Sequence, residues 1–316
     1  MVRKQPCNPA TLQPSNKHTL NKKIIIAGGK GQVGQCFQAL AAHYPQWTFV
    51  FVDSEALDIA QNKAVNRFFE AENSQTLLAC INCAAYTAVD KAESEPKVAR
   101  SVNATGAKNV AVACAKAGVP LIHLSTDYVY HNRQNTPFKE GDPETPKGVY
   151  AATKLAGDRA VLKSHPAAGM VIRTSWVYSP YGHNFLKTML RLGQERASLS
   201  VVFDQIGTPT YAPDLAAAIL DILQKVDNEE IKPEQLAGIW HYSNEGVTSW
   251  YDFAVAIMTL AGLSCKIQPI ETSQYPTPAQ RPPFSVLHKA KIKAAFGLDI
   301  PHWRTGVLRC LEALGY

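Results

Sequence analysis

The chain has 316 residues, of which 46% are hydrophobic and 18% are charged, a balance typical of a globular protein with a buried core. No apolar run approaches the roughly 20 residues that cross a bilayer, and the N-terminus lacks the apolar core of a signal peptide. The net charge of +6 comes without a basic block interleaved with aromatic residues, so we expect neither a nucleic-acid partner nor a membrane partner.

The N-terminal stretch and the cysteines indicate the cellular setting. Residues 1–21 are polar, contain prolines and lack acidic residues, which predicts a disordered tail. The seven cysteines are scattered through expected strands and helices, which favours a reducing compartment and a cytoplasmic location. Cys80 and Cys83 form a C-x-x-C without a second ligand pair, so we interpret them as small buried hydrophobes.

From Lys22 onward, short apolar runs rich in β-branched residues alternate with longer amphipathic segments. The strands are expected at 23–29, 47–53, 77–85, 119–126 and 169–178. The helices are expected at 31–44, 62–72, 95–118 and 150–165. Several strands are apolar throughout, as in a parallel sheet covered on both faces. The pattern predicts an α/β fold with a Rossmann-type doubly wound parallel sheet.

After about residue 178 the alternation loosens, which predicts a smaller, mainly C-terminal lobe. Helices are expected there at 183–196, 248–262 and 302–316, separated by proline-rich links such as 274–283. The predicted dinucleotide-binding domain covers 22–177, with a returning segment at about 211–242. The predicted substrate-binding lobe covers 178–210 and 243–316.

Three glycines, Gly28, Gly31 and Gly34, follow the first expected strand and lead into a helix, which is the context of a dinucleotide-binding loop. Glycine permits positive φ, and the missing side chains let backbone N–H groups approach a pyrophosphate. A tight strand-to-helix turn without a ligand is the alternative interpretation. Asp53 ends the second strand, where a carboxylate binds an adenosine ribose and repels a 2′-phosphate. Lys30 offsets that charge, so both NADH and NADPH stay open.

Tyr150 and Lys154 lie four positions apart and therefore share one face of an expected helix. A catalytic phenol needs its anion stabilised, and lowering its pKa by about three units takes roughly 4 kcal/mol, much of which an ammonium and a cationic nicotinamide can supply. Thr126 ends a strand, where it can hold a carbonyl oxygen beside Tyr150. Taken alone, the pair reads as two surface side chains and the threonine as a turn hydroxyl. Together with the glycine loop they predict a dehydrogenase site.

Longer motifs carry a family resemblance. The runs "INCAAYTAVDKAESEP", "LSTDYVY", "YAATKLAGD", "RTSWVYSPYGHNF" and "DQIGTPTYAPDLA" resemble the extended short-chain dehydrogenases, and within them the dTDP-4-dehydrorhamnose reductase family. The resemblance runs from about Lys22 to the C-terminus. It implies that NADPH or NADH reduces the 4-keto group of the nucleotide sugar dTDP-4-dehydro-L-rhamnose, giving dTDP-L-rhamnose for cell-surface polysaccharide.

The resemblance also implies roles for individual residues, with catalysis assigned to Thr126, Tyr150 and Lys154. The predicted cofactor contacts combine the glycine loop and Asp53 with the residues that the resemblance implies. They are Gly28, Gly31, Gln32, Val33, Gly34, Asp53, Asp58, Ile59, Ala84, Ala85, Tyr86, Asn103, Tyr150 and Lys154. The implied substrate contacts are Val89, Asp127, Tyr128, Trp176, Asn184, Gln205 and Arg281. Trp176 can also be read as a core residue, and Asn184 and Gln205 as turn residues.

Three positions depart from the family pattern. Cys36 stands where the family often has a glutamate that, in some members, belongs to an intersubunit magnesium site; we therefore expect no functional metal and leave a homodimer open. Phe284 replaces the asparagine of an R-P-x-N-S motif, which leaves the exact sugar open. Ser54 replaces an arginine that often follows the second-strand acid, which leans toward NADH.

Two alternative functions keep the fold. One is epimerisation or dehydration of a nucleotide sugar, although the dehydratases usually carry Asp-Glu after the threonine and this chain reads "TDYVY". The other is a non-enzymatic regulator, because the regulatory subunit of methionine adenosyltransferase resembles this family and binds dinucleotide. Intact Thr126, Tyr150 and Lys154 favour an enzyme.

Overall fold

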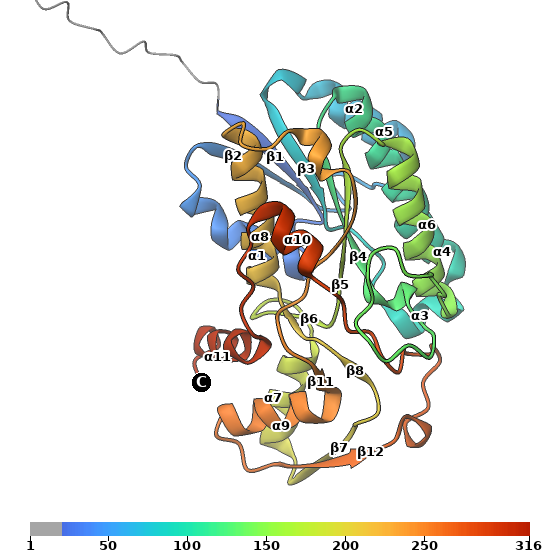
Figure 1. Ribbon diagram of the computed structural model, residues 1–316, viewed down its shortest axis with the longest axis vertical. Helices are drawn as coiled ribbons and strands as arrows, with labels where there is room; N and C mark the ends of the chain where they lie inside the picture. The colour runs from blue at the N-terminus through green and yellow to red at the C-terminus, as the bar shows by residue number, and fades with distance from the viewer. Residues whose placement is uncertain (1–20) are drawn as a thin grey trace, which may run out of the picture.

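The computed structural model describes residues 21–316, so the predicted tail lies outside the described residues apart from Asn21. Six parallel strands form the central sheet in the order β10-β5-β4-β3-β1-β2. Their bounds are β1 Lys22–Ala27, β2 Trp47–Val52, β3 Leu77–Asn82, β4 Leu121–Thr126, β5 Gly169–Thr174 and β10 Gly238–His241. The predicted doubly wound parallel sheet is confirmed (Figure 1).

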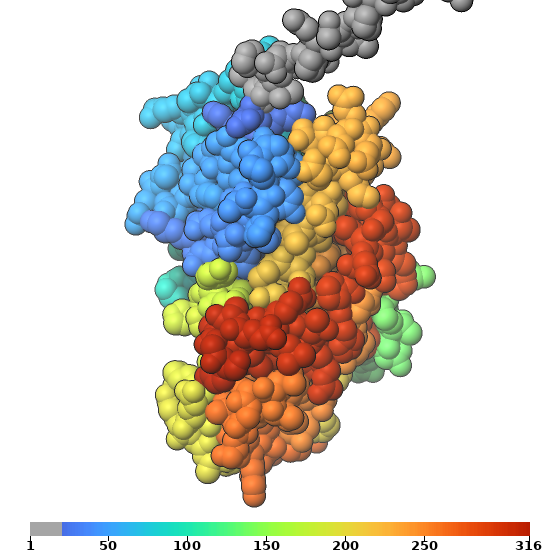
Figure 2. All heavy atoms as spheres, turned by 90° about the vertical axis from the view of Figure 1, so that its left-hand side faces the viewer, coloured from blue at the N-terminus to red at the C-terminus, as the bar shows by residue number. Residues whose placement is uncertain are grey.

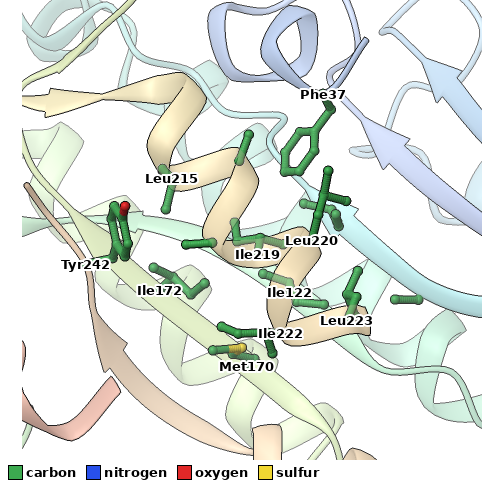
Figure 3. Close-up of a cluster of buried hydrophobic side chains, with 14 of the residues drawn as sticks. Phe37, Ile122, Met170, Ile172, Leu215, Ile219, Leu220, Ile222, Leu223 and Tyr242 are labelled. Carbon is green, nitrogen blue, oxygen red and sulfur yellow. The ribbon is translucent and has the colours of Figure 1, made fainter. Parts of the chain in front are cut away.

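Helices cover both faces of this sheet. On one face lie α1 Gln32–Leu40, α8 Ala212–Asp227 and α10 Ala290–Phe296, and on the other lie α2 Asn62–Ala71, α5 Ala107–Ala117 and α6 Gly148–Ser164. Figure 3 shows the first face, where side chains of α8 meet Ile122 of β4 and Ile172 of β5. Because successive strand residues point to opposite faces, His123 and Arg173 turn toward α6.

Two expected elements are interrupted in the structure. The helix expected at 95–118 consists of α4 Pro96–Arg100, a π-helical turn Ser101–Gly106, and α5. The strand expected at 169–178 ends with β5 at Thr174 and resumes as β6 Val177–Tyr178. Trp176 breaks it with a φ of 47°, in the left-handed region that side chains other than glycine rarely adopt. Such backbone strain clusters at functional sites.

A second core forms below the sheet (Figure 1), where apolar side chains of α7 Phe185–Glu195, α9 Trp250–Leu260 and α11 Trp303–Ala313 meet. Three pairs of short strands accompany it: β7 Ser198–Val202 with β12 Lys266–Ile270, β8 Ile206–Gly207 with β11 Thr248–Ser249, and β6 with β9 Thr210–Tyr211. In Figure 2 the C-terminal segment, in dark red, lies between the blue upper part of the molecule and the orange segment at its lower end.

The segment predicted to return to the sheet domain holds α8, which packs on α1, and β10, which pairs with β5 at the sheet edge. The boundaries predicted for the two domains stay a prediction. Within residues 21–316, every helix is too short or too polar to cross a bilayer.

Candidate active site

The carboxyl ends of β3, β4 and β5 border a cavity of about 440 Å³. This is the edge where open α/β sheets bind ligands. Many of the predicted site residues line it: Gly31, Gln32, Val33, Gly34, Ala85, Val89, Thr126, Asp127, Tyr128, Tyr150, Lys154 and Trp176. The structure therefore brings the glycine loop, the three predicted catalytic residues and part of the predicted substrate set into one space.

The glycine loop is fixed against the ends of two strands. The N–H groups of Gly28 and Gly29 both donate to the Val52 carbonyl at the end of β2, at 2.8 and 2.9 Å. Gly28 has a φ of 84°, and a Cβ there would lie 2.8 Å from the Ala84 nitrogen. The N-cap of α1 is Gly31, which offers no side-chain cap, so the first-turn N–H groups are free to bind an anion. These features fit the pyrophosphate of a dinucleotide.

Tyr150 lies in the first turn of α6, where Glu93 of α3 Val89–Ser94 accepts the Val149 N–H at 2.7 Å. The Tyr128 ring packs edge-to-face on Tyr150, with centroids 5.7 Å apart. Burial raises the pKa of Tyr150 to about 12, and a hydrogen bond with Thr126 opposes the rise. Thr126 thus lies beside Tyr150 as predicted. The expected acidification of the phenol, however, requires more than the chain alone supplies.

Lys154 is one turn further along α6 and is only 2% exposed. Its ammonium donates to the Leu124 carbonyl at 2.7 Å and lies 3.5 Å from Nε2 of His123. Burial lowers the pKa of Lys154 to about 8, whereas the charges of Asp158 and Cys83 act to raise it. At neutral pH the side chain therefore still carries its proton.

Asp127 presents a second titratable group to the cavity and is 2% exposed. Its Oδ1 accepts the Thr126 hydroxyl at 3.2 Å, whereas its Oδ2 has no hydrogen-bond partner within residues 21–316. Burial raises the pKa of Asp127 to about 7, although the nearby Ser285 and Thr126 hydroxyls act to lower it. The carboxyl group can therefore serve as donor or acceptor to a bound hydroxyl near neutral pH.

The remaining predicted residues lie outside the cavity lining: Gly28, Asp53, Asp58, Ile59, Ala84, Tyr86, Asn103, Asn184, Gln205 and Arg281. At the end of β2, Asp53 accepts the N–H groups of Glu55 and Ala56 and pairs with Lys30 at 2.5 Å. Lys30 also contacts Glu55 at 3.1 Å, so two carboxylates surround one ammonium. Hydrogen bonding from Lys30 lowers the pKa of Asp53, which keeps its carboxylate ionised.

Neighbouring chain segments hold three more predicted cofactor residues. Asp58 accepts the Ala60 N–H at 3.0 Å, and Ile59 is buried in the core of the α6 face. Asn103 is buried in the π-helical turn, where its side chain binds both the N–H and the carbonyl of Tyr86. These bonds tie the Asn103 side chain to the backbone of the 84–86 segment. Direct contact of Asn103 with the cofactor stays a prediction.

Three predicted substrate residues make contacts within the chain. Arg281 forms a two-pronged ion pair with Asp90 of α3, at 2.7 and 2.6 Å. The Asn184 oxygen caps α7, and its amide donates to Gln32 Oε1 at 2.8 Å. Gln205 donates to the Thr272 hydroxyl at 3.0 Å. Direct substrate contacts by these three residues stay a prediction.

Other residues line the cavity without having been predicted: Cys83, Thr87, Leu124, Ser125, Thr174, Val177, His183 and Trp250. The Trp250 indole stacks on Trp176 with centroids 3.7 Å apart, and a Cβ at Gly207 would lie 2.6 Å from the Trp176 ring. This stack explains how Trp176 is held in its strained conformation. Trp250 is far from Trp176 in the chain and carries no local signal, whereas Ser125 and His183 fall inside the family motifs.

The structure also shows the surroundings of two residues that depart from the family pattern and of the C-x-x-C cysteines. Cys36 is buried, and burial raises the pKa of its thiol to about 12. Phe284 lies 6.2 Å from Phe138, ring to ring, in a small apolar cluster. Cys80 and Cys83 are free thiols; Cys80 is buried as expected, whereas Cys83 is half-buried and lines the cavity. The expected lack of a functional metal stays a prediction.

The fold is a doubly wound parallel sheet with a glycine loop, and its cavity contains Thr126, Tyr150 and Lys154. This combination defines an oxidoreductase of the extended short-chain dehydrogenase class. The family model for the RmlD substrate binding domain matches residues 22–315, so the chain belongs to the dTDP-4-dehydrorhamnose reductase family.

Relatives and solved structures agree with this placement. The chain is 40% identical to dTDP-4-dehydrorhamnose reductase of Shigella flexneri over 299 residues, covering 92% of this chain and 97% of the relative. It is 35% identical over 292 residues to spore coat polysaccharide biosynthesis protein SpsK of Bacillus subtilis, with coverage of 92% and 97%. The dTDP-4-dehydrorhamnose reductase of Bacillus anthracis, solved in complex with NADP, superposes with a TM-score of 0.85 at 35% identity, covering 93% of this chain and all of the other.

Proposed function

We propose that this protein reduces the 4-keto group of dTDP-4-dehydro-L-rhamnose with NADH or NADPH, giving dTDP-L-rhamnose. The supporting observation is that Thr126, Tyr150 and Lys154 line the same cavity as the glycine loop. The relatives named as dTDP-4-dehydrorhamnose reductases cover almost the whole chain, which supports the same substrate here.

A bound nicotinamide supplies the hydride that adds to the keto carbon. Tyr150 donates its hydroxyl proton to the keto oxygen, and the adjacent Thr126 hydroxyl orients that oxygen. The Lys154 ammonium stabilises the tyrosinate that results. Gly28, Gly31 and the first turn of α1 would hold the cofactor pyrophosphate. The carboxyl group of Asp127 and the stacked Trp176 would contact the sugar nucleotide, since both line the cavity.

The charges around Asp53 bear on cofactor choice. Asp53 and Glu55 outnumber the single ammonium of Lys30, and Ser54 supplies no positive charge. A 2′-phosphate would meet this excess of negative charge, so we expect NADH to be the better substrate.

The test is nicotinamide absorbance during incubation of the purified protein with dTDP-4-dehydro-L-rhamnose and either cofactor. We expect turnover with both and a higher kcat/KM with NADH. Tyr150→Phe should lower kcat by about 10²- to 10⁴-fold while leaving cofactor affinity unchanged. Tyr44→Phe is the matched control, because within residues 21–316 the Tyr44 hydroxyl donates only to Asp221, at 3.5 Å, and Tyr44 is not among the residues that line the cavity.

Three outcomes would contradict the proposal. A folded protein that oxidises neither cofactor with this sugar lacks the proposed activity. Conversion of a nucleotide sugar without net cofactor oxidation would indicate an epimerase or a dehydratase. Equal losses in Tyr150→Phe and Tyr44→Phe would remove Tyr150 from the mechanism.

We also infer a cytoplasmic location and leave a homodimer as a proposal. The six described cysteines are all free, as expected in a reducing compartment. Light scattering of the purified chain decides between monomer and dimer.

A further inference from the structure

A layer of polar side chains lies between the sheet and α6. In the register of the sheet, Asn82 of β3 pairs with His123 of β4, and Ser125 of β4 pairs with Arg173 of β5. All four are buried, although the rest of this face is covered by apolar side chains. Buried polar groups cost free energy unless they are paired, so this layer needs partners on the helix that covers it.

α6 offers Lys154 and Asp158, one turn apart on the same helix face and both buried. Asp158 Oδ2 accepts Nε of Arg173 at 3.1 Å. Asp158 Oδ1 has no hydrogen-bond partner within residues 21–316, and neither has the Ser125 hydroxyl. Burial raises the pKa of Asp158, whereas the charges of Arg173 and Lys154 favour its ionised carboxylate. The nearby Ser125 hydroxyl acts in the same direction as these charges, although it does not meet the geometry of a hydrogen bond. One oxygen of this buried carboxylate is therefore available to groups other than Arg173.

The proton position on His123 follows from its neighbours. The Asn82 side-chain oxygen accepts the Ala84 N–H at 3.1 Å, so the Asn82 NH₂ group is the part that faces His123 Nδ1, also at 3.1 Å. Nδ1 must then be an acceptor. Burial and the Lys154 ammonium lower the pKa of His123, so the ring is neutral and carries its one proton on Nε2.

Two donors consequently face each other inside the protein. The Nε2–H group of His123 lies 3.5 Å from the Lys154 ammonium, and neither can accept from the other. The nearby anionic acceptor is Asp158 Oδ1, which is 4.0 Å from His123 Nε2. We propose that Asp158 is a positioning residue for Lys154: its carboxylate, one helical turn away, keeps the lysine charged while the Leu124 carbonyl holds the ammonium at the cavity. The part Lys154 plays in reduction rests on the proposed function.

The pH range of the effect depends on the titratable and charged groups of α6 and of the segments that pack against it. They include Tyr150 and Asp158 on α6, Cys83 after β3, His123 and Asp127 on and after β4, Arg173 on β5, Glu144 before α6, Glu93 of α3 and Cys114 of α5. The pKa of Tyr150 is raised to about 12, so Tyr150 keeps its proton where Lys154, with its pKa lowered to about 8, loses one. Asp127, with its pKa raised to about 7, releases its proton before Lys154 does. We therefore assign the alkaline limb of the activity profile near pH 8 to Lys154.

The first test is the pH profile of kcat for Asp158→Asn. Removing a nearby opposite charge lowers the pKa of a lysine, so the alkaline limb should move down by about one pH unit or more. At pH values above the limb, turnover of Asp158→Asn should then be about tenfold lower than that of the unmodified protein. At pH values well below the limb, the two proteins should agree within about twofold. A uniform loss at every pH, or an unmoved limb, would overturn the proposal.

A control and a second variant separate charge from folding. Glu144→Gln removes another carboxylate bound to Arg173, but one that is not among the groups that shift the pKa of Lys154, so the limb should stay in place. In Asp158→Asn/Arg173→Met no unpaired arginine remains beside the lost carboxylate, which protects folding. The limb should move in the same direction in this paired variant, but by less than in Asp158→Asn, because loss of the Arg173 cation acts in the opposite sense. A limb that moves upward there would contradict the proposal.

A direct measurement does not depend on turnover. NMR of the chain labelled at the lysine ε-carbons, with the Lys154 signal assigned by its loss in Lys154→Met, should show titration near pH 8. In Asp158→Asn the titration should move down by about one unit or more. An unchanged titration together with normal turnover would contradict only the positioning role of Asp158. A shifted titration in a protein that does not turn over the ketosugar would contradict the proposed function but support the electrostatic role of Asp158.

Discussion

Ile172 and Arg173 are neighbours in β5, and both are fully buried, yet they meet opposite surroundings. Ile172 faces α8 within a continuous apolar cluster (Figure 3). Arg173 faces α6, where it binds Asp158, Glu144 and the Tyr130 hydroxyl. The α8 face therefore gains stability from apolar burial, whereas the α6 face near the cavity buries charges that must all be paired.

The difference follows the position of the cavity. Lys154 and Tyr150 stand on α6, so the polar layer adjoins the helix that carries the proposed chemistry. In a low-dielectric surrounding each charge shifts the pKa values of its neighbours more strongly. The same surrounding raises the free-energy cost of every unpaired polar group. The apolar face has no such coupling. Substitutions on the two faces should therefore differ in size and in pH dependence.

The largest loss of stability is expected for Arg173→Met. It leaves the buried Asp158 carboxylate and the Glu144 carboxylate without their shared cation, which should lower the free energy of unfolding by about 3–5 kcal/mol. Urea unfolding measures this. Arg159→Met is the control, because Arg159 also binds Glu144, at 3.0 Å, but is 67% exposed. Its loss should stay under about 1 kcal/mol, and equal losses in the two variants would contradict the contrast.

Asp127 should make stability depend on pH. Its pKa is about 7 in the folded chain, against an ordinary value of about 3.9 expected when unfolded, so the folded protein holds a proton that the unfolded chain has released. The contribution of Asp127 to the free energy of unfolding is complete below about pH 4 and is lost as the pH rises through about 7. The total loss is up to about 4 kcal/mol.

Asp127→Asn should flatten this decline in urea titrations at a series of pH values. Asp142→Asn is the control, because hydrogen bonds from Gln134 and Lys139 lower the pKa of Asp142, and its effect is confined to acid pH. If Asp127→Asn and the unmodified protein lose stability in parallel, Asp127 is not the group responsible.

The smallest effect is expected for Ile172→Val on the apolar face. Loss of one buried methyl group should lower the free energy of unfolding by about 1 kcal/mol and leave the pH profile of kcat unchanged. Leu308→Val, at a side chain that is 44% exposed, should change stability by less than about 0.5 kcal/mol. A moved alkaline limb in Ile172→Val would show that the two faces are coupled.

The regular parts of the fold could be predicted from local patterns. The runs that became β1 to β5 are apolar and rich in β-branched residues, and the segments between them have helical periodicity. β10 was predicted only as part of a returning segment, because four residues carry too weak a pattern. The break at Trp176 was missed, since its cause is the distant Trp250 ring. The π-helical turn at Asn103 was missed as well, because its amide bonds the backbone of Tyr86.

The candidate site divides in the same way. Gly31, Thr126, Tyr150 and Lys154 belong to motifs with fixed spacing, and all four line the cavity as the sequence predicted. Arg281, Asn184 and Gln205 came from family motifs alone, and in the structure their side chains bind other parts of the chain. Spacing along one helix or loop can be read directly, whereas contacts across the lobe depend on how distant segments meet.

The sequence by itself determined β1 to β5 and most of the helices between them, the glycine loop and the Tyr150–Lys154 pair, because short-range periodicity and backbone geometry act within a few residues. Only the tertiary structure decided how the buried charges are arranged. His123, Asp158 and Arg173 come from β4, α6 and β5, and their protonation depends on burial and on one another. Desolvation and charge pairing act through space, so no reading along the chain could have placed them together.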